Sequence, residues 1–113
     1  MKPVRFIGSA REDLSAFPQS AKSHIGHELF LVQEGFEPTS WKPMKVVGMG
    51  AREIRMNQPL GAFRVVYVAA FASAIYVLHA FQKKTRTTSH KDIELARRRY
   101  RQVAVMERLH RHG

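Results

Sequence analysis

Seventeen residues, 65–81, form a nearly continuous apolar run in which His79 is the one side chain that titrates near neutral pH. A run of this length lies at the lower limit for a membrane-spanning helix. Its content of Val, Tyr, Ile and Phe favours strands instead. Small residues at positions 69, 70, 72 and 73 stand where a turn would fall, and Arg64 precedes the run. The run therefore predicts a β-hairpin and no association with a membrane.

The residues before this run indicate one strand followed by two helices. Residues 4–7 fit a short strand, and capping-box spacing that begins at Ser9 predicts a helix directly after it. Pro18 ends that helix. A second helix is expected to continue until Gly35, which is a common residue just beyond a helix end.

The rest of the chain indicates a meander and a final helix. Strands are expected at 51–56, 62–69 and 74–81, after a loop over residues 35–50. Thr88 or Ser89 can cap the last helix, and residues 108–113 are expected to fray. The predicted fold class is α+β, with one antiparallel sheet made of the short N-terminal strand and the three-stranded meander. An N-terminal helix pair and a C-terminal helix pack on that sheet.

The chain is strongly basic. Its 113 residues suffice for a single domain, and we assign residues 1–113 to one domain. The formal net charge is +10, and the part after residue 82 holds ten Lys or Arg residues against three acids. A one-signed excess of this size favours a polyanionic partner such as nucleic acid, an anionic membrane surface or an acidic protein. A solvated helix face is the alternative.

Several classes of site are disfavoured by the residues that the chain lacks. There is no cysteine, which excludes disulfides, thiol nucleophiles and thiolate zinc sites and is compatible with the cytoplasm. The first residues have no apolar core of signal-peptide length. His24 and His27 have helical spacing but no evident further ligand, and no glycine-rich phosphate loop is present. We therefore expect no metal and no cofactor.

Cations at the end of the hairpin and within the strands are the main site candidates. Lys83, Lys84 and Arg86 stand among threonines directly after the apolar run, where they have no packing role. Phosphate is the anion that such a cluster fits best. Arg64 lies in a run of aromatic and branched residues, where an arginine is costly unless it is paired or faces a wet groove. Arg55 is a strand arginine of the preceding strand. It is either a site residue or the partner of a carboxylate, such as that of Glu53, in an ion pair.

Three further cations and one histidine are candidates of lower specificity. Lys42 and Lys45 flank Trp41 in a loop, where charge and stacking can hold nucleic acid, although the ring can equally fold onto the core. Arg52 is a third strand arginine and is grouped with them as an RNA-binding candidate. His79 alternates with two apolar residues, so it is either a half-buried strand histidine or a residue that transfers protons.

This set of cations fits the binding or the scission of RNA. RNA carries its own nucleophile, the 2′-hydroxyl, so a protein needs to align it, move two protons and stabilise the charge on phosphorus. An arginine fork matches phosphate oxygens. A lysine among other cations has a lowered pKa and can transfer protons. Arg55, Arg64, Lys83, Lys84 and His79 are therefore the candidate catalytic residues.

Four blocks of the sequence resemble the phage-derived, HigB-like branch of the RelE/ParE toxin superfamily. They are Trp-Lys-Pro-Met-Lys at 41–45, Arg-Glu-Ile-Arg at 52–55, the strand at 61–68 and the stretch at 76–85. The resemblance implies a small α+β toxin of a type II toxin–antitoxin system. It implies a helix-turn-helix antitoxin encoded next to it, through which alone operator DNA is bound. RelE-type members cleave mRNA in the ribosomal A site without a metal, and their basic residues correspond to Arg55, Arg64 and one of Lys83, Lys84 or Arg86.

The sequence departs from this pattern at one place. Many RelE-type enzymes have a tyrosine just after the last strand, where this chain has Thr85, Thr87 and Thr88, and the next tyrosine is Tyr100 in the last helix. The superfamily also contains ParE-like gyrase poisons, which do not cleave RNA. A gyrase-inhibiting toxin is therefore the alternative function. A third hypothesis covers an inactive or regulatory nucleic-acid-binding module or a membrane-associated peptide.

Overall fold

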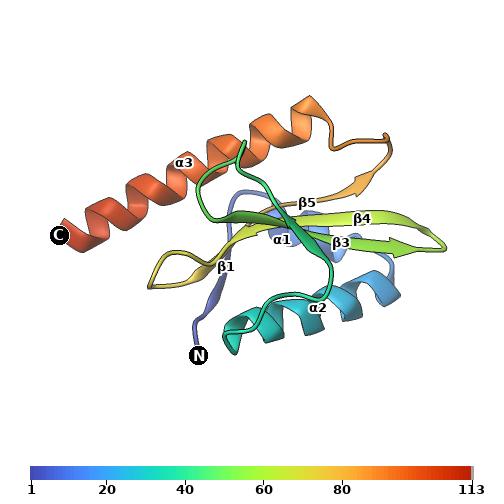
Figure 1. The fold of residues 1–113 in the computed structure, drawn as a ribbon, viewed down its shortest axis with the longest axis horizontal. Coiled ribbons are helices and arrows are strands. Elements are labelled where there is room, and N and C mark those ends of the chain that lie inside the picture. The colour runs from blue at the N-terminus through green and yellow to red at the C-terminus, as the bar shows by residue number, and fades with distance from the viewer. Residues whose placement is uncertain (113) are drawn as a thin grey trace.

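A computed structural model describes residues 1–112, without the side chains of residues 111 and 112. Five strands form one sheet in the order β1-β5-β4-β3-β2, and three helices pack on it (Figure 1). The elements are β1 (Val4–Phe6), α1 (Ala10–Ser15), α2 (Gln19–Gln33), β2 (Trp41–Pro43), β3 (Ala51–Gln58), β4 (Gly61–Val68), β5 (Ile75–Lys83) and α3 (His90–His112). The predicted α+β class with a three-stranded meander is confirmed.

The sheet is not wholly antiparallel, because β1 pairs in parallel with β5. Its other edge is β2, which pairs antiparallel with β3 and places Trp41 opposite Ile54. The sequence predicted a loop over residues 35–50, so β2 was missed. It has three residues, one of which is Pro43, and such a segment carries no alternating pattern. Short strands at both edges are a common protection against edge-to-edge pairing.

The apolar run at 65–81 is the β4–β5 hairpin that its composition predicts. Val65 lies opposite Ala80, and the chain turns between Val68 and Ile75. Both strands are almost completely buried because helices cover both faces. No helix in residues 1–112 combines the length and the apolar composition that crossing a membrane requires.

The helices cover opposite faces of the sheet, and Figure 1 shows α3 above the strands and α2 below them. One core lies between the sheet and the helices α1 and α2, with Ile25, Ile54 and Phe63 among its buried residues. The other lies under α3 and contains Val66 and Leu78 of the sheet. Ala96 and Val103 of α3 are fully buried there. The sheet is thus the middle of three layers.

Local signals set most helix ends. Pro18 stands immediately before α2, and Gly35 follows it with a φ of 89°, a conformation that glycine adopts at little cost. The Ser89 hydroxyl accepts a hydrogen bond from the Asp92 amide at 3.2 Å, which caps α3 as expected. At the other end α3 continues to His112, so the fraying predicted from residue 108 is absent over 108–112; Gly113 lies outside the described residues.

Candidate nucleic-acid interface

A β-bulge aligns the candidate residues of three strands on the face under α3. Arg64 lies opposite Arg55 on β3 and opposite Phe81 on β5. The register shifts between Val66 and Tyr67, so that His79 becomes the partner of Val66. A bulge inverts the alternation of the strand beyond it. His79 and Phe81 therefore share the Arg64 face, and so does Lys83 further along the strand.

This arrangement corrects the sequence interpretation of β5. Simple alternation put His79 on the same face as Val77. In the structure Val77 belongs to the core under α1 and α2, whereas Phe81 belongs to the core under α3. Nothing in the strand sequence marks the bulge, because the residues on both sides of it are apolar.

Arg64 is buried at the centre of this face, with 2% of its surface exposed. Its Nη1 donates hydrogen bonds to Asn57 Oδ1 at 3.1 Å and to the Phe63 carbonyl at 2.9 Å. Its Nε lies 3.8 Å from Glu53 Oε1 without forming a hydrogen bond. Burial lowers the pKa of Arg64, and the Glu53 carboxylate counteracts that shift. The guanidinium is therefore held in a fixed orientation by its neighbours.

Glu53 is the acid around which the cations gather. Its side chain is 1% exposed, and Oε1 lies 3.9 Å from Lys42 Nζ. Oε2 accepts a hydrogen bond from the Thr88 hydroxyl at 2.7 Å, which fastens the segment before α3 to β3. Arg55, the partner that the sequence suggested for Glu53, is exposed instead. Glu53 thus pairs with Arg64 and Lys42 and leaves Arg55 open to solvent.

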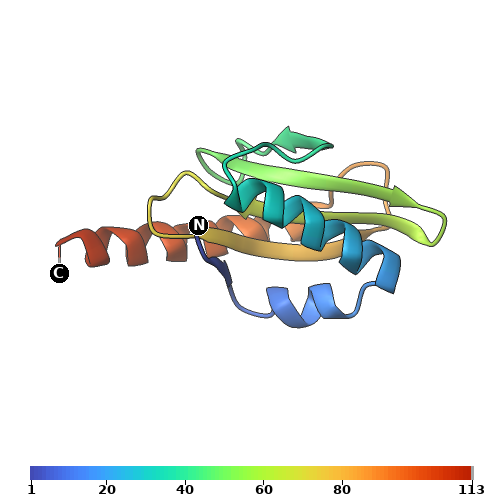
Figure 2. The ribbon, with the colours of Figure 1, turned by 90° about the horizontal axis from the view of Figure 1, so that it is seen from below.

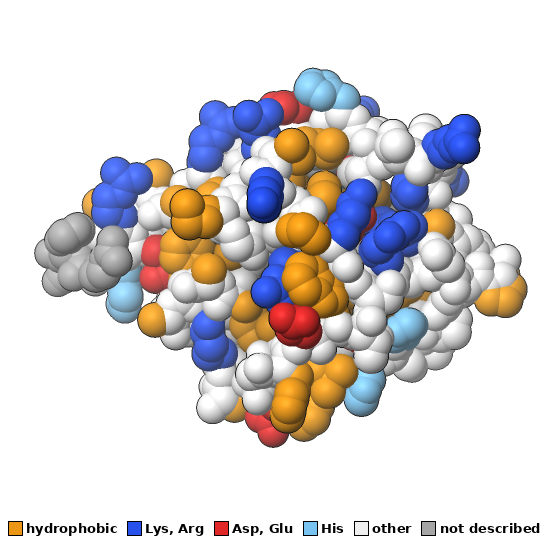
Figure 3. Space-filling model, in the orientation of Figure 1, with side chains coloured by type: hydrophobic (Ala, Val, Ile, Leu, Met, Phe, Trp, Pro, Cys, Tyr) orange, Lys and Arg blue, Asp and Glu red, His pale blue; other side chains and the backbone are white. Residues whose placement is uncertain are grey.

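Lys83 shows that the cations influence one another. Partial burial lowers its pKa most, followed by the charges of Arg64, Arg55 and Lys42, whereas Glu53 raises it. We call these four residues, Lys42, Arg55, Arg64 and Lys83, the cation cluster. Figure 3 shows Lys and Arg side chains gathered over this part of the sheet. The cluster combines a fixed guanidinium, an exposed one and an amine that loses its proton more readily than usual.

The remaining sequence candidates lie outside the cluster. Arg52 points to the opposite face, where its guanidinium covers the Trp41 ring at 4.0 Å and lies 4.0 Å from Glu37. One face of Trp41 is therefore already occupied, and the ring is half-buried. Lys45, Lys84 and Arg86 are exposed, so they are accessible to a ligand that approaches from solvent.

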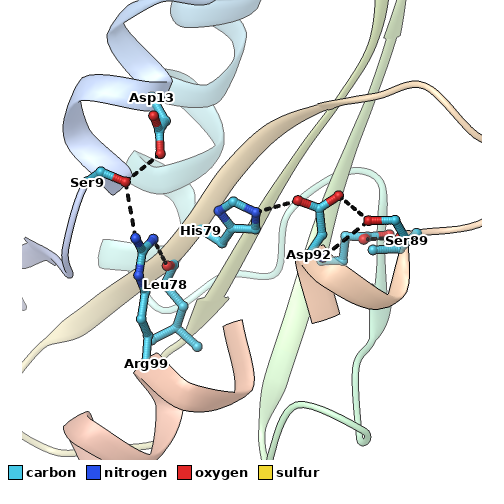
Figure 4. A network of polar contacts seen from close by, with 9 residues as sticks. Ser9, Asp13, Leu78, His79, Ser89, Asp92 and Arg99 are labelled. Atoms are coloured by element: carbon cyan, nitrogen blue, oxygen red, sulfur yellow. Dashed lines mark hydrogen bonds and ion pairs between the residues drawn. The ribbon is translucent and has the colours of Figure 1, made fainter. Parts of the chain in front are cut away.

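His79 is a buried histidine that joins the sheet to α3. It is 6% exposed, stacks on Phe81 and places Nε2 2.7 Å from Asp92 Oδ1 in the first turn of the helix. Asp92 Oδ2 accepts a hydrogen bond from Ser89. Figure 4 shows His79 pointing toward this end of α3. Its position fits a structural role more directly than contact with a ligand.

A second contact fixes α3 about two turns further on. Arg99 donates hydrogen bonds to the Leu78 carbonyl at 2.9 Å and to Ser9 Oγ at 3.1 Å. Ser9 in turn donates to Asp13 (Figure 4). The start of α3 is therefore held at two points beside the cation cluster.

None of the three tyrosines belongs to the cluster. Tyr67 faces the core under α1 and α2, and Tyr100 donates a hydrogen bond to the Met49 carbonyl. Tyr76 bonds to Ser73 and Glu107 near the β4–β5 turn. Any proton transfer at the cluster therefore depends on lysine, histidine or carboxylate groups.

The described residues also contain no grouping of three or more His, Cys, Asp or Glu side chains suited to a metal. His24 lies 3.3 Å from Glu28, one helical turn away in α2.

Sequence reasoning missed two members of the site. Glu53 was considered only as a partner for Arg55, and Thr88 only as a helix cap. Alternation did place Glu53 on the Arg55 face, and this was a usable signal. The approach of Thr88 to β3 depends on the path of the connection between β5 and α3, which residue types do not encode.

Comparison with known proteins places the chain in a family. Among solved structures, a chain of the RelBE2 toxin–antitoxin complex from Mycobacterium tuberculosis is similar with a TM-score of 0.51 and 22% identity, over 73% of this chain and 98% of that one. That likeness shows a shared fold. No curated protein matches. The family model described as "Phage derived protein Gp49-like" matches residues 12–101. The chain therefore belongs to the phage-derived Gp49-like family, in agreement with the phage-derived, RelE-like group that its sequence resembles.

Proposed function

We propose that this protein is the toxin of a type II toxin–antitoxin system and cleaves mRNA on the ribosome without a metal. The cation cluster carries the proposal, because Arg55, Arg64, Lys42 and Lys83 converge on one face around a single carboxylate. The Gp49-like family and the fold shared with a chain of a toxin–antitoxin complex support the toxin assignment. The cytoplasm, where translation takes place, is the expected site of action.

The cluster contains the groups that scission by the 2′-hydroxyl requires. Lys83, with its lowered pKa, accepts the proton of the 2′-hydroxyl in its neutral form. The 2′-oxygen then bonds to phosphorus while the P–O5′ bond breaks, and the ammonium formed on Lys83 returns that proton to the leaving 5′-oxygen. Arg55 is exposed and binds the phosphate from solvent. The Nη1 and Nε atoms of Arg64 face protein groups, which leaves Nη2 to stabilise charge on the phosphorus oxygens. Both arginines keep their charge throughout, because a guanidinium is not deprotonated in proteins.

The surrounding residues position the RNA and the cluster. Lys42, Lys45, Lys84 and Arg86 are exposed and contribute contacts to the RNA backbone, which fix register without reading sequence. Glu53 orients Arg64 and binds Thr88 of the adjoining segment. The bond from His79 to Asp92 holds the start of α3 beside the site.

Induced expression followed by primer extension on translated transcripts tests this function. We expect growth arrest together with new 5′ ends inside coding regions, and no cuts in the same RNA when it is incubated with the purified protein without ribosomes. The variant Arg64→Ala serves as the inactive control. Growth arrest with intact transcripts would contradict the proposal.

A gyrase-inhibiting toxin is the second candidate, and one observation favours it. The cluster has no tyrosine, which many RelE-type enzymes place after the last strand. Such a toxin would inhibit supercoiling by purified gyrase and induce the DNA-damage response while leaving mRNA intact. If the cluster acts on RNA instead, we expect neither inhibition of supercoiling nor induction of the DNA-damage response.

A further inference from the structure

Helix α3 has a second set of apolar residues, which the fold does not bury. The sheet-facing side of the helix is buried through Ala96 and Val103. On another side, Val105, Met106 and Leu109 are 46%, 45% and 67% exposed. Their spacing of three and four residues puts them on one strip of the helix surface. We call Val105, Met106 and Leu109 the outer stripe.

The end of α3 that carries the outer stripe projects beyond the sheet. Figures 1 and 2 both show the last turns of the helix continuing past the ends of the strands. The large apolar side chains of this part of the helix remain exposed over the described residues. Single exposed apolar residues need no explanation, but three within five positions on a projecting helix are typical of a docking surface.

Cations border the outer stripe, and they outnumber the acids of α3. Asp92 bonds to His79, Glu94 pairs with Arg97 at 2.9 Å, and Glu107 bonds to Tyr76. The remaining exposed cations lie beside the stripe and form no ion pair with an acid among residues 1–110, whose side chains the structure describes. They are Lys91, Arg98, Arg101 and Arg108.

The charge decides among the possible occupants. A second copy of this chain would bring the same cations together, and each copy has a net charge of +10. The phosphates of RNA would neutralise the cations but would not cover the apolar side chains of Val105, Met106 and Leu109. An amphipathic helix with acidic flanks satisfies both features, because its apolar side covers the stripe while its carboxylates face the arginines.

We infer that the outer stripe is the docking surface for an acidic amphipathic helix of a partner protein. The antitoxin is the natural source of that helix, and this identification rests on the proposed toxin function. The surface is separate from the cation cluster, so the partner can stay bound through α3 whether or not the cluster is occupied.

The test measures binding of a defined probe to the purified full-length chain. The probe is a fluorescein-labelled helical peptide of about three heptads with leucine at the a and d positions and glutamate at e and g. The matched peptide has lysine at e and g. Fluorescence anisotropy is expected to show saturable binding of the acidic peptide alone. Equal binding of the two peptides, or no binding of either, would overturn the inference.

A pair of variants with equal charge separates specific docking from general attraction. Met106→Glu with Leu109→Glu is expected to weaken binding of the acidic peptide about tenfold or more. The control, Phe36→Glu with Leu60→Glu, adds the same charge at residues that are 66% and 67% exposed and lie outside α3. It is expected to bind within about twofold of the parent chain. Equal weakening in both double variants would show non-specific electrostatics and contradict the inference.

Two further measurements identify a wrong occupant. Sedimentation of the chain alone should show a monomer, and a dimer that Met106→Glu with Leu109→Glu dissociates would assign the stripe to a second copy. A single-stranded RNA oligonucleotide that competes fully with the acidic peptide would assign it to nucleic acid. Serine at positions 106 and 109 is the milder variant if the glutamates lower the thermal stability.

Growth arrest distinguishes this inference from the proposed function. Met106 and Leu109 lie outside the cation cluster, so their double variant is expected to arrest growth like the parent chain. Loss of peptide binding with unchanged arrest supports both proposals. Absence of arrest by the parent chain would refute the toxin function. The peptide-binding result would still test the docking surface, because it does not depend on growth arrest.

Discussion

Strands β3, β4 and β5 present an apolar face to α1 and α2. Their face on the side of α3 combines an apolar core with buried ionisable residues, and we call it the charged face. Under α1 and α2 the strands bury Ile54, Phe63 and Val65. Under α3 the same strands bury Glu53, Arg64 and His79, which are 1%, 2% and 6% exposed. The two faces have the same backbone, so the difference between them comes from side-chain chemistry alone.

The comparison separates residues that hold the fold from residues that serve a site. Apolar side chains stabilise by leaving water, and they do so without regard to their exact partners. Buried ions gain little or nothing over well-packed apolar groups of the same size, because desolvation offsets their attraction. The charged face is therefore not explained by stability, and its residues are the ones expected to carry the activity.

The largest expected effect comes from the apolar face. Phe63 is 2% exposed, and its ring lies 4.9 Å from that of Phe17, which is in the link between α1 and α2. Phe63→Ala is expected to lower the free energy of unfolding by about 3–5 kcal/mol, through lost burial and the cavity left behind. Urea unfolding followed by circular dichroism measures this value. The control Leu60→Ala, at a residue that is 67% exposed, should change it by less than about 0.5 kcal/mol.

Removing the buried arginine of the charged face is expected to abolish activity without unfolding the chain. Arg64→Ala should reduce mRNA cleavage about 100-fold or more, because an oriented charge at the phosphate is lost. Circular dichroism should retain the native spectrum. Arg52→Ala on the opposite face is the matched control and should keep full toxicity. A fully toxic Arg64→Ala variant would show that the cluster has been assigned wrongly.

The pH dependence of cleavage tests the role of Lys83. Partial burial and the neighbouring cations lower the pKa of Lys83. A base acts in its deprotonated form, so activity should rise with pH and reach its midpoint below the usual lysine value of about 10.4. Glu53 raises this pKa. Glu53→Gln should therefore move the rising limb to lower pH, and Lys83→Ala should remove it. An unchanged limb in both variants would exclude Lys83 as the base.

Much of the fold could be predicted from the sequence because it depends on local signals. The hairpin at 65–81, Pro18 before α2 and the cap at Ser89 each act over a few residues. The site was predicted less well, because its geometry depends on distant contacts. Alternation within β3 was enough to separate Arg52 from Glu53 and Arg55, but the pairing of Arg55 with Arg64 depends on the register between β3 and β4. The bulge that redirects His79 and the contact of Thr88 with Glu53 arise only when strands and connections are assembled.

The smallest expected effect concerns the bond between the charged face and α3. Asp92 accepts from Ser89 and lies 2.7 Å from His79 Nε2, at the start of a helix that Arg99 fixes independently. Asp92→Asn keeps the size of the side chain and removes its charge. The expected cost is about 1 kcal/mol of stability, the usual value for one hydrogen bond or cap, together with a loss of cleavage below about tenfold. Urea unfolding and primer extension measure the two effects. Because the second fastening at Arg99 remains, a loss of cleavage as large as that of Arg64→Ala would mean that His79 and Asp92 take part in the chemistry themselves.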